Sequence, residues 1–527
     1  MSSDAIGSNT PLLAPCQSAK EASEPIEDHD HRERRHAPRI TPRDSKSRIF
    51  AVCGFFVSSL MASSAVSTAI QSLSYPAIFG GHKSEALTST LYQFLLVFGQ
   101  CIGCFLGGLA CDVYGRRPSY IVSLGVMILV LGLNASVLAG DYFSGTLPRG
   151  IFHQVILQIL WLILSTLLGI SSTLLYPICG CMLIESTPAI QRHVDTAKYM
   201  CAQGVAQLIG GSLVVGLLAA FGAQTRGPAE FDSQALLLIL FCIPIIATAL
   251  LFVAALKWLN ESTFYYDYRA DLNLYMGTRT PSRLSPSLIK SHVMTCWKTC
   301  MEYPERLAGC AVPWLLFDVT FYCDGVLGLI SVGDNESMTV PSALGNDPPA
   351  MFEDNLLSLM VVGISLVGYL LGVKSAKMVP PKLMQLMGFV VLSFSFFGLA
   401  LSLWSVDTPE SAVTDRVADC LLFNAVFRFF NFGPNITTYL IPLESWPTPA
   451  RGTMHGIAGS AAKLGATIGL GLFWLLRSRK LMCVACAICA GLATLTTMMY
   501  TPHLVPVSAA LQLIDKEWEE GRVSSND

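Results

Sequence analysis

The sequence predicts an all-α membrane protein with twelve transmembrane helices, six in each half of the chain. Of its 527 residues, 52% are hydrophobic and only 13% are charged, and the mean hydropathy is +0.52. A soluble globular chain has about 25% charged residues, so a composition this apolar indicates an integral membrane protein. A polar stretch, residues 257–306, divides the apolar runs into two groups of six.

Each predicted helix is an apolar run of roughly the 20 residues that a bilayer requires. The first run begins near Ile49 after a polar segment, so no cleavable signal peptide is expected. In chain order the predicted spans are residues 49–74, 88–110, 118–139, 153–183, 197–221, 235–257, 307–331, 355–373, 383–404, 418–441, 453–476 and 480–500.

Basic residues indicate which side of the membrane each polar segment occupies. Arginines and lysines cluster just before the first span and again in the central stretch, which places both in the cytoplasm. The predicted outer loops, 331–354 and 405–418, are acidic with almost no basic residues. The predicted domains are a disordered cytoplasmic tail (1–47), an N-terminal six-helix bundle (48–258), a cytoplasmic central loop (259–306), a C-terminal six-helix bundle (307–502) and a cytoplasmic tail (503–527).

One outer loop carries a candidate modification site. Asn335 begins the tripeptide Asn-Glu-Ser, an acceptor for an N-linked glycan, so glycosylation is predicted there. The plasma membrane is favoured over a vacuolar or other internal membrane. The pair Leu12-Leu13 would be a sorting signal to an internal membrane, but it lacks an acid four residues upstream.

Several classes of function are not supported by the sequence. The net charge of −3 gives no indication of nucleic-acid binding. No nucleophile–base set or metal cluster is found outside the spans, so no enzymatic activity, cofactor or metal is expected. Most of the 17 cysteines lie in apolar runs and are expected to pack as small apolar side chains. Cys296 and Cys300, on a possible amphipathic helix with His292, are expected to be unmodified, with lipidation or metal binding as the alternative.

A carboxylate in the seventh span indicates a functional site. Trp314, Asp318 and Tyr322 are spaced four residues apart within 307–329, and residues so spaced differ by only about 40° around a helix. The three side chains therefore share one face. An ionisable group in an apolar span costs roughly 2.5 kcal/mol or more unless it faces a wet cavity, which favours a transport site over a purely structural ion pair.

A second pattern lies between the second and third spans. Residues 108–117 read Gly-Leu-Ala-Cys-Asp-Val-Tyr-Gly-Arg-Arg. This stretch resembles the G-x3-D-x2-G-R-R loop of the major facilitator superfamily, with Val113 where a basic residue is usual. The resemblance implies two six-helix bundles, each built of inverted repeats, that rock about a site at mid-membrane. The predicted conformational residues are Gly108, Asp112, Gly115, Arg116, Arg117, Glu185, Arg192, Glu444 and Arg451.

The second half of the chain narrows the resemblance. Residues 431–438, Asn-Phe-Gly-Pro-Asn-Ile-Thr-Thr, precede closely spaced motifs at 444–456 and 463–466. These motifs, the W-x3-D-x3-Y pattern and the pair Tyr176-Pro177 resemble the phosphate:proton symporter family of fungi and plants. Phenol, amide and indole donors suit oxyanions, and a lysine offsets their charge. The resemblance implies a substrate site of Tyr176, Gln203, Trp314, Asp318, Tyr322 and Asn435, with Lys463 close by.

The chain departs from that family at three acidic positions. The first span has Ser58 and Met61 where the family has two acids, and Leu175 stands where the family has the aspartate of D-Y-P. Asp318 is then the one carboxylate predicted to remain at the site. Each transported proton needs a carboxylate whose ionisation alternates, so Asp318 is the predicted proton-coupling residue.

One basic residue is a further candidate for binding substrate. Arg428 precedes Asn435 by seven residues, which places it on the same face of the tenth span and about 10 Å nearer the outside. A guanidinium presents a fork of donors that suits phosphate oxygens. Snorkelling, or pairing with an outer acid such as Asp419, is the alternative.

The sequence therefore predicts a secondary transporter of inorganic phosphate that works by alternating access and is coupled to protons through Asp318. The expected partners are a small anionic substrate, protons and the lipid membrane. An organophosphate carrier, such as one for glycerophosphodiesters, is the alternative within transport. A phosphate sensor that binds without transporting is the alternative from another class.

Overall fold

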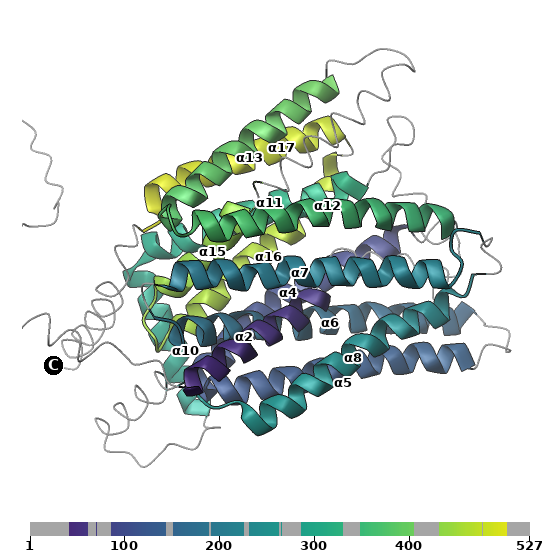
Figure 1. Ribbon diagram of the computed structural model, residues 1–527, viewed down its shortest axis with the longest axis horizontal. Helices are drawn as coiled ribbons and strands as arrows, with labels where there is room; N and C mark the ends of the chain where they lie inside the picture. The colour runs from purple at the N-terminus through teal and green to yellow at the C-terminus, as the bar shows by residue number, and fades with distance from the viewer. Residues whose placement is uncertain are drawn as a thin grey trace, which may run out of the picture. The chain divides into compact units, whose positions relative to one another are not determined.

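The computed structural model describes residues 42–61, 70, 86–143, 151–188, 191–225, 231–262, 265, 286–329, 348–404, 430, 432–476 and 478–502. Within these ranges the long elements are all helices, and no strand occurs (Figure 1). The helices are α2 (Pro42–Met61), α4 (Ala86–Tyr114), α5 (Arg116–Phe143), α6 (Ile151–Glu185), α7 (Arg192–Ala220), α8 (Ser233–Trp258), α10 (Pro286–Glu302), α11 (Pro304–Leu329), α12 (Pro348–Ser375), α13 (Pro381–Trp404), α15 (Phe432–Glu444), α16 (Arg451–Leu476) and α17 (Arg479–Tyr500).

The helices confirm the predicted all-α membrane fold. Each of the twelve predicted spans overlaps one of these helices, and eight helices in the described ranges are long and apolar enough to cross a membrane. The other four overlapping helices are α2, α11, α15 and α16, and the last of these carries Arg451, His455 and Lys463 among its apolar residues. The amphipathic helix expected in the central stretch is α10.

The first helix starts earlier than the expected boundary at residue 48. It begins at Pro42, and Asp44 stands in its first turn. Both features suit a helix start, because proline lacks the N–H that would be unbonded there and an acid favours the positive end of the helix dipole. The helix therefore carries basic residues of the amino-terminal cluster, including Arg48, into its ordered first turns.

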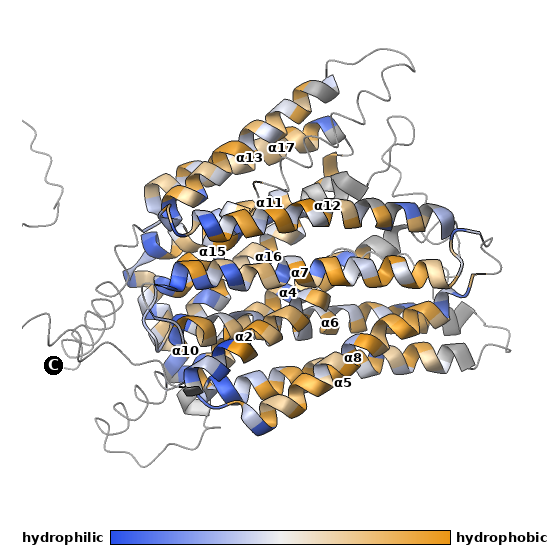
Figure 2. Ribbon diagram, in the orientation of Figure 1, coloured by the Kyte–Doolittle hydropathy of each residue, from blue (hydrophilic) through white to orange (hydrophobic). Residues whose placement is uncertain are grey.

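Apolar side chains cover the outward faces of the helices, as lipid contact requires. On α8, Ile246, Leu250 and Val253 are exposed, and they are spaced so as to share one face of the helix. Figure 2 shows hydrophobic residues along most of the length of the long helices, with hydrophilic residues frequent near the helix ends around α10. An exposed apolar stripe on a helix of this length is the pattern of a surface solvated by lipid.

Glycines bring selected helix pairs into backbone contact. Gly99, Gly103 and Gly107 lie at four-residue intervals on α4, and a Cβ at any of them would overlap a backbone carbonyl of α6. A Cβ on Gly465 of α16 would likewise overlap the Leu315 carbonyl of α11. Small residues at such spacing allow helices to approach closely in a membrane. These contacts fix α4 against α6 and α11 against α16, the helices that carry most of the site.

Some predicted features lie outside the described residues. They are the glycan acceptor Asn335, the candidate ligand Arg428, most of the amino-terminal tail and the tail from residue 503. Their predictions stand as sequence-based expectations.

Candidate functional site

The predicted acidic face of α11 is directed at α16. The Nζ of Lys463 on α16 donates hydrogen bonds to Asp318 Oδ2 at 2.9 Å and to the Tyr322 hydroxyl at 3.3 Å. Asp318 is only 4% exposed, so its charge is balanced inside the protein. Asp318 and Tyr322 share one helix face as expected, and Lys463, which the family resemblance placed close by, bonds to both.

Aromatic rings adjoin this ion pair. The rings of Trp314 on α11 and Tyr176 on α6 have centroids 6.0 Å apart, so two predicted ligands from different halves of the chain meet. His455 of α16 lies 5.4 Å from Trp314, and Tyr439 of α15 lies 4.8 Å from His455, centroid to centroid. The Tyr439 hydroxyl donates to the Tyr176 carbonyl at 2.8 Å. These aromatic side chains join helices α6, α11, α15 and α16 at one place.

The two remaining predicted ligands within the described residues lie on α7 and α15. Asn435 of α15 donates a hydrogen bond to the Tyr369 hydroxyl of α12. Gln203 of α7 has a buried Oε1 with no hydrogen-bond partner among the described residues. A buried amide oxygen without a donor costs roughly 1–3 kcal/mol, which a bound ligand or water would recover. No contact in the described part of the chain joins Gln203 directly to Lys463 or Asp318.

Ser58, Met61 and Leu175 occupy the three positions where the resembled family has acids, and their side chains are either apolar or hydrogen-bonded within the protein. Ser58 on α2 donates to the Ser172 carbonyl of α6, which holds the hydroxyl against the neighbouring helix. Met61 and Leu175 are both buried in the hydrophobic core. None of these three side chains titrates, so α2 and α6 supply no carboxylate at these positions.

Three residues at the site were not predicted as ligands. Tyr439 follows Asn435 by one turn, and its hydroxyl also lies 3.0 Å from the Tyr199 hydroxyl. His455 is buried, and neither ring nitrogen has a hydrogen-bond partner in the described ranges. Tyr369 was not singled out at all. The one-turn spacing from Asn435 is a sequence signal for Tyr439, and His455 lies within the 444–456 motif.

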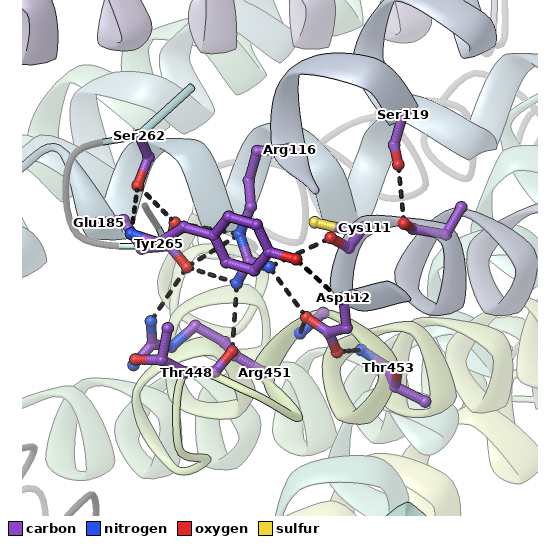
Figure 3. A network of polar contacts seen from close by, with 12 residues as sticks. Cys111, Asp112, Arg116, Ser119, Glu185, Ser262, Tyr265, Thr448, Arg451 and Thr453 are labelled. Atoms are coloured by element: carbon purple, nitrogen blue, oxygen red, sulfur yellow. Dashed lines mark hydrogen bonds and ion pairs between the residues drawn. The ribbon is translucent and has the colours of Figure 1, made fainter. Parts of the chain in front are cut away.

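A second group of polar residues joins the end of α4 to the start of α16 (Figure 3). Arg116 is buried at its centre, with Nη2 2.5 Å from Glu185 Oε1 and Nη1 3.3 Å from Asp112 Oδ1. Its Nη2 also donates a hydrogen bond, at 3.2 Å, to the carbonyl of Thr448 in the second half of the chain. Bidentate charge-assisted bonds of this kind are among the stronger polar contacts. We call the group formed by Asp112, Arg116, Glu185, Glu261, Ser262, Tyr265, Thr448, Arg451, Gly452 and Thr453 the α4–α16 network.

Asp112 binds the amino-terminal end of α16. Its Oδ1 accepts the Gly452 N–H at 3.1 Å and its Oδ2 accepts the Thr453 N–H at 2.6 Å. The first N–H groups of a helix have no partner within it and carry its positive dipole end, so a carboxylate there is stabilising. A Cβ on Gly108, one turn earlier on α4, would overlap the Gly452 carbonyl. The glycine therefore lets Asp112 come close enough to bind.

Two residues that follow α8, Glu261 and Tyr265, bind the turn between α4 and α5 and the end of α4. Gly115 has a φ of +103°, a conformation that side chains disfavour, and it turns the chain from α4 into α5. The Arg116 and Arg117 N–H groups donate to Glu261 Oε1 at 2.9 and 3.1 Å, and Tyr265 donates from its hydroxyl to the Asp112 carbonyl at 2.9 Å. Burial raises the pKa of the Glu261 carboxyl.

Arg451 links the two halves through the same acid that Arg116 binds. Its Nη1 lies 3.3 Å from Glu185 Oε1, and its Nε donates to the Leu443 carbonyl at 3.0 Å. Arg192 makes the matching contact in the first half, where its Nε donates to the Ile184 carbonyl at 3.1 Å. All nine predicted conformational residues are within the described ranges. Four of them, Asp112, Arg116, Glu185 and Arg451, belong to the α4–α16 network.

The amphipathic helix α10 contacts this network through a histidine. His292 Nε2 lies 2.9 Å from the Thr453 hydroxyl and 3.8 Å from Asp112 Oδ2. Cys296 Sγ lies 3.4 Å from the same nitrogen, and burial raises the pKa of the Cys296 thiol to about 12. The described residues contain no cluster of three or more histidine, cysteine or acidic side chains arranged to hold a metal ion.

Relatives with assigned names match most of the chain. It is 28% identical over 423 residues to the probable inorganic phosphate transporter 1-8 of Arabidopsis thaliana, which covers 75% of each protein. It is 26% identical over 402 residues to the low affinity inorganic phosphate transporter 1 of Petunia hybrida, covering 70% of each.

Solved structures share the fold at lower sequence identity. The proton:xylose symporter XylE superposes with a TM-score of 0.63 at 15% identity, covering 89% of this chain and 98% of that one. The Escherichia coli fucose:proton symporter FucP superposes with a TM-score of 0.58 at 11% identity, covering 87% and 100%. A family model described as Major Facilitator Superfamily matches residues 51–470. This match spans most of the 527 residues, and the protein therefore belongs to the major facilitator superfamily.

Proposed function

We propose that this protein is a secondary active transporter of inorganic phosphate, coupled to protons through Asp318 and working by alternating access. The observation that carries the proposal is the bond from Lys463 to both Asp318 and Tyr322 beside the rings of Trp314 and Tyr176. An ammonium and several neutral donors are thereby available to an oxyanion. The names of the plant relatives support phosphate as the substrate.

The ion pair suggests how substrate and proton are linked. Lys463 is neutralised by Asp318 in the structure, and its Nζ is within bonding distance of both Asp318 and Tyr322. An arriving phosphate competes with Asp318 for the ammonium. Once Asp318 loses that partner, protonation of its carboxyl removes a buried charge, so substrate binding favours proton binding. Release of phosphate reverses both steps.

The α4–α16 network is the proposed gate on the cytoplasmic side. It joins the loop after α4 to the start of α16 by buried ion pairs and by N–H bonds to Asp112. Opening a path to the cytoplasm requires the two proposed six-helix bundles to part at this point, which breaks these contacts. We propose residence in the plasma membrane, with the network facing the cytoplasm.

Flux measured with purified protein tests the proposal. Full-length protein is reconstituted in liposomes, and uptake of radiolabelled phosphate is measured with and without an inward proton gradient. We expect accumulation with the gradient and equilibration alone without it. Glycerophosphocholine and other phosphodiesters are measured in parallel. Preference for a diester would replace phosphate by an organophosphate, and binding of phosphate without any flux would indicate a sensor.

A matched pair of variants locates the site. Tyr322→Phe removes a hydroxyl from the Lys463 cluster, and Tyr500→Phe removes one from an exposed tyrosine at the end of α17. We expect the first to weaken phosphate binding about tenfold or more, since one charge-assisted bond contributes about 1.5–3 kcal/mol, and the second to leave binding unchanged. Equal behaviour of the two variants would remove Tyr322 from the proposed site.

A further inference from the structure

Two acids in the chain occur in the same local sequence but have different surroundings. Glu185 and Glu444 each begin the pattern Glu-Ser-x-Pro-x3-Arg, at 185–192 and 444–451. Glu185 accepts hydrogen bonds from Arg116, Arg451 and Ser262 at 2.5, 3.3 and 3.0 Å. Glu444 is 2% exposed, and neither of its oxygens has a hydrogen-bond partner among the described residues.

The loop sequences explain part of this difference. Arg116, the main partner of Glu185, is the first residue of α5, directly after the one-residue loop that follows α4. The corresponding loop in the second half, between α12 and α13, contains no arginine. Lys374 in the last turn of α12 and Lys377 in the loop are both exposed, whereas Glu444 is buried. The second acid thus has no counterpart of Arg116 within this loop.

The charges that act on Glu444 come from α7 and α16. They are those of Arg192 and Arg451. Both guanidinium groups make bonds to other acceptors, since the Nε of Arg192 donates to the Ile184 and Thr187 carbonyls and Arg451 donates to Leu443 and Glu185. The helices packed against α15 also carry other titratable or charged groups. They include His193 on α7, Glu185 on α6, His455 and Lys463 on α16, Arg306, Cys310 and Asp318 on α11, Lys374 on α12 and Lys382 on α13.

A buried carboxyl in these surroundings is more stable with a proton than without one. An ionised carboxylate that accepts no hydrogen bond carries the full cost of leaving water, whereas the neutral acid carries much less. Arg451 is already close, because its Nε bonds to the carbonyl of Leu443, the residue next to Glu444. If the contact of Arg451 with Glu185 breaks, its Nη1 loses that acceptor, and Glu444 is a buried acid on which the Arg451 charge already acts.

We propose that Glu444 is a second proton-binding site, occupied while Arg451 binds Glu185 and emptied when the α4–α16 network opens. In the closed network Arg451 is neutralised by Glu185 and the Glu444 carboxyl is neutral. On opening, Arg451 pairs with Glu444, the O–H bond of that carboxyl breaks, and one proton leaves. Glu185 keeps Arg116 as its partner. The departing proton lowers the net charge of this group of side chains by one, and the carboxylate that it leaves behind is paired with Arg451.

The inference deepens the proposed transport function and rests on it for its direction. A network that binds a proton when closed and releases it when open to the cytoplasm moves protons inward, as a symporter requires. It also supplies a carboxylate in a chain that has serine, methionine and leucine at Ser58, Met61 and Leu175. Proton-linked opening itself is measurable without any substrate or flux.

Hydrogen exchange of the network amides tests the proposal on purified full-length protein. The Gly452 and Thr453 N–H groups bond to Asp112 only in the closed network, so their protection reports closure. After correction for intrinsic exchange rates, we expect protection to fall as the pH rises from about 5.5 to 8.5. For one linked proton the change is at most about tenfold per pH unit. Protection that is constant over this range would overturn the proposal.

Variants separate Glu444 from other groups that titrate near the network. His292 lies 3.8 Å from Asp112, so all measurements are made in a His292→Gln background. Glu444→Gln mimics the protonated acid, and we expect a closed network with pH-independent protection. Glu444→Asp keeps a titrating group and keeps the dependence. An unaltered pH profile in Glu444→Gln would assign the proton elsewhere.

A control shows that the result concerns the network and not the substrate site. Asp318→Asn alters the proposed substrate site, and it should leave the pH dependence of Gly452 and Thr453 protection intact. Loss of transport in Asp318→Asn with this dependence retained would separate the two carboxyls. If phosphate proves not to be the substrate, the exchange result is unaffected, so failure of either proposal is visible separately.

Discussion

Asp318 and Lys463 form an ion pair of 2.9 Å between α11 and α16, in the interior of a membrane protein. The two residues are separated by 145 positions in the sequence. Each is an unfavourable group to bury alone, and each makes burial of the other acceptable. A substrate that binds one of them must therefore change the state of the other.

The first prediction concerns the stability of this pair. Lys463→Gln leaves Asp318 buried without its cation, and we expect a loss of about 3–5 kcal/mol in unfolding free energy. The double variant Asp318→Asn/Lys463→Gln should be more stable than Lys463→Gln alone, because no uncompensated charge remains. Thermal unfolding of the detergent-purified wild type, both single variants and the double variant gives the coupling free energy between the two residues. Additive effects of the two substitutions would show that the residues do not depend on each other.

Transport by an Asp318 variant is the second prediction. Asp318→Asn keeps the size and hydrogen bonding of the side chain but cannot titrate. We expect proton-driven accumulation of phosphate to be abolished while some binding and exchange remain. Counterflow of labelled phosphate in liposomes serves as the control for folded, substrate-competent protein. Accumulation at the wild-type rate would remove Asp318 from the coupling mechanism.

Substitution of a glycine between α4 and α16 gives the third prediction. Gly108→Ala places a methyl group against the Gly452 carbonyl, so the helices must separate there. We expect weaker Asp112 bonds, seen as at least tenfold faster exchange of the Gly452 and Thr453 amides. The matched control is Gly132→Ala on α5, where a Cβ would meet nothing within 4 Å. Similar exchange in the two variants would contradict the close contact.

The fourth prediction concerns Arg428, which lies outside the described residues. We expect Arg428→Ala to weaken phosphate affinity about tenfold or more, the contribution of one charge-assisted contact. Arg428→Lys should recover part of the affinity, since an ammonium lacks the fork of donors. Binding is measured on folded, size-selected protein. An unchanged dissociation constant in Arg428→Ala, even with reduced yield, would assign the arginine a structural role.

Thiol reactivity on α10 is the fifth prediction. Burial raises the pKa of Cys296 to about 12, so almost none of this thiol is ionised at pH 7. We expect slow alkylation by a water-soluble maleimide, with a rate that rises about tenfold per pH unit as the thiolate fraction grows. Peptide mapping compares it with Cys300, which is less buried on the same helix. Equal rates at Cys296 and Cys300 would contradict the burial of Cys296 against Trp446 and Met454.

The helices and much of the site could be predicted because their signals are local. Apolar runs of membrane length need no knowledge of their neighbours, and the spacing of Asp318 and Tyr322 fixes their common face. Hydrogen-bond partners that lie on other helices could not be predicted in this way. Tyr369 bonds to Asn435, and the Thr448 carbonyl bonds to Arg116, yet neither has a distinctive local pattern. Such contacts depend on helix packing, which periodicity does not encode.

The different surroundings of Glu185 and Glu444 also could not be predicted from local sequence patterns. The sequence presents Glu185 and Glu444 in one pattern, which suggests one role. Arg451 lies in the second pattern but bonds to the acid of the first. Only the three-dimensional structure reveals that exchange of partners, because it takes place between segments separated by 266 positions.

The glycine contact between α4 and α16 affects how the proposed gate would open. Where Gly108 meets Gly452 and Gly456, backbone lies against backbone. Helices that touch in this way part without any side chain changing rotamer, and little apolar area is exposed when they do. Resistance to opening is then concentrated in the charged groups beside the glycines. These groups are buried and poorly screened by salt, so pH, more than ionic strength or lipid order, should govern how often this side of the protein opens.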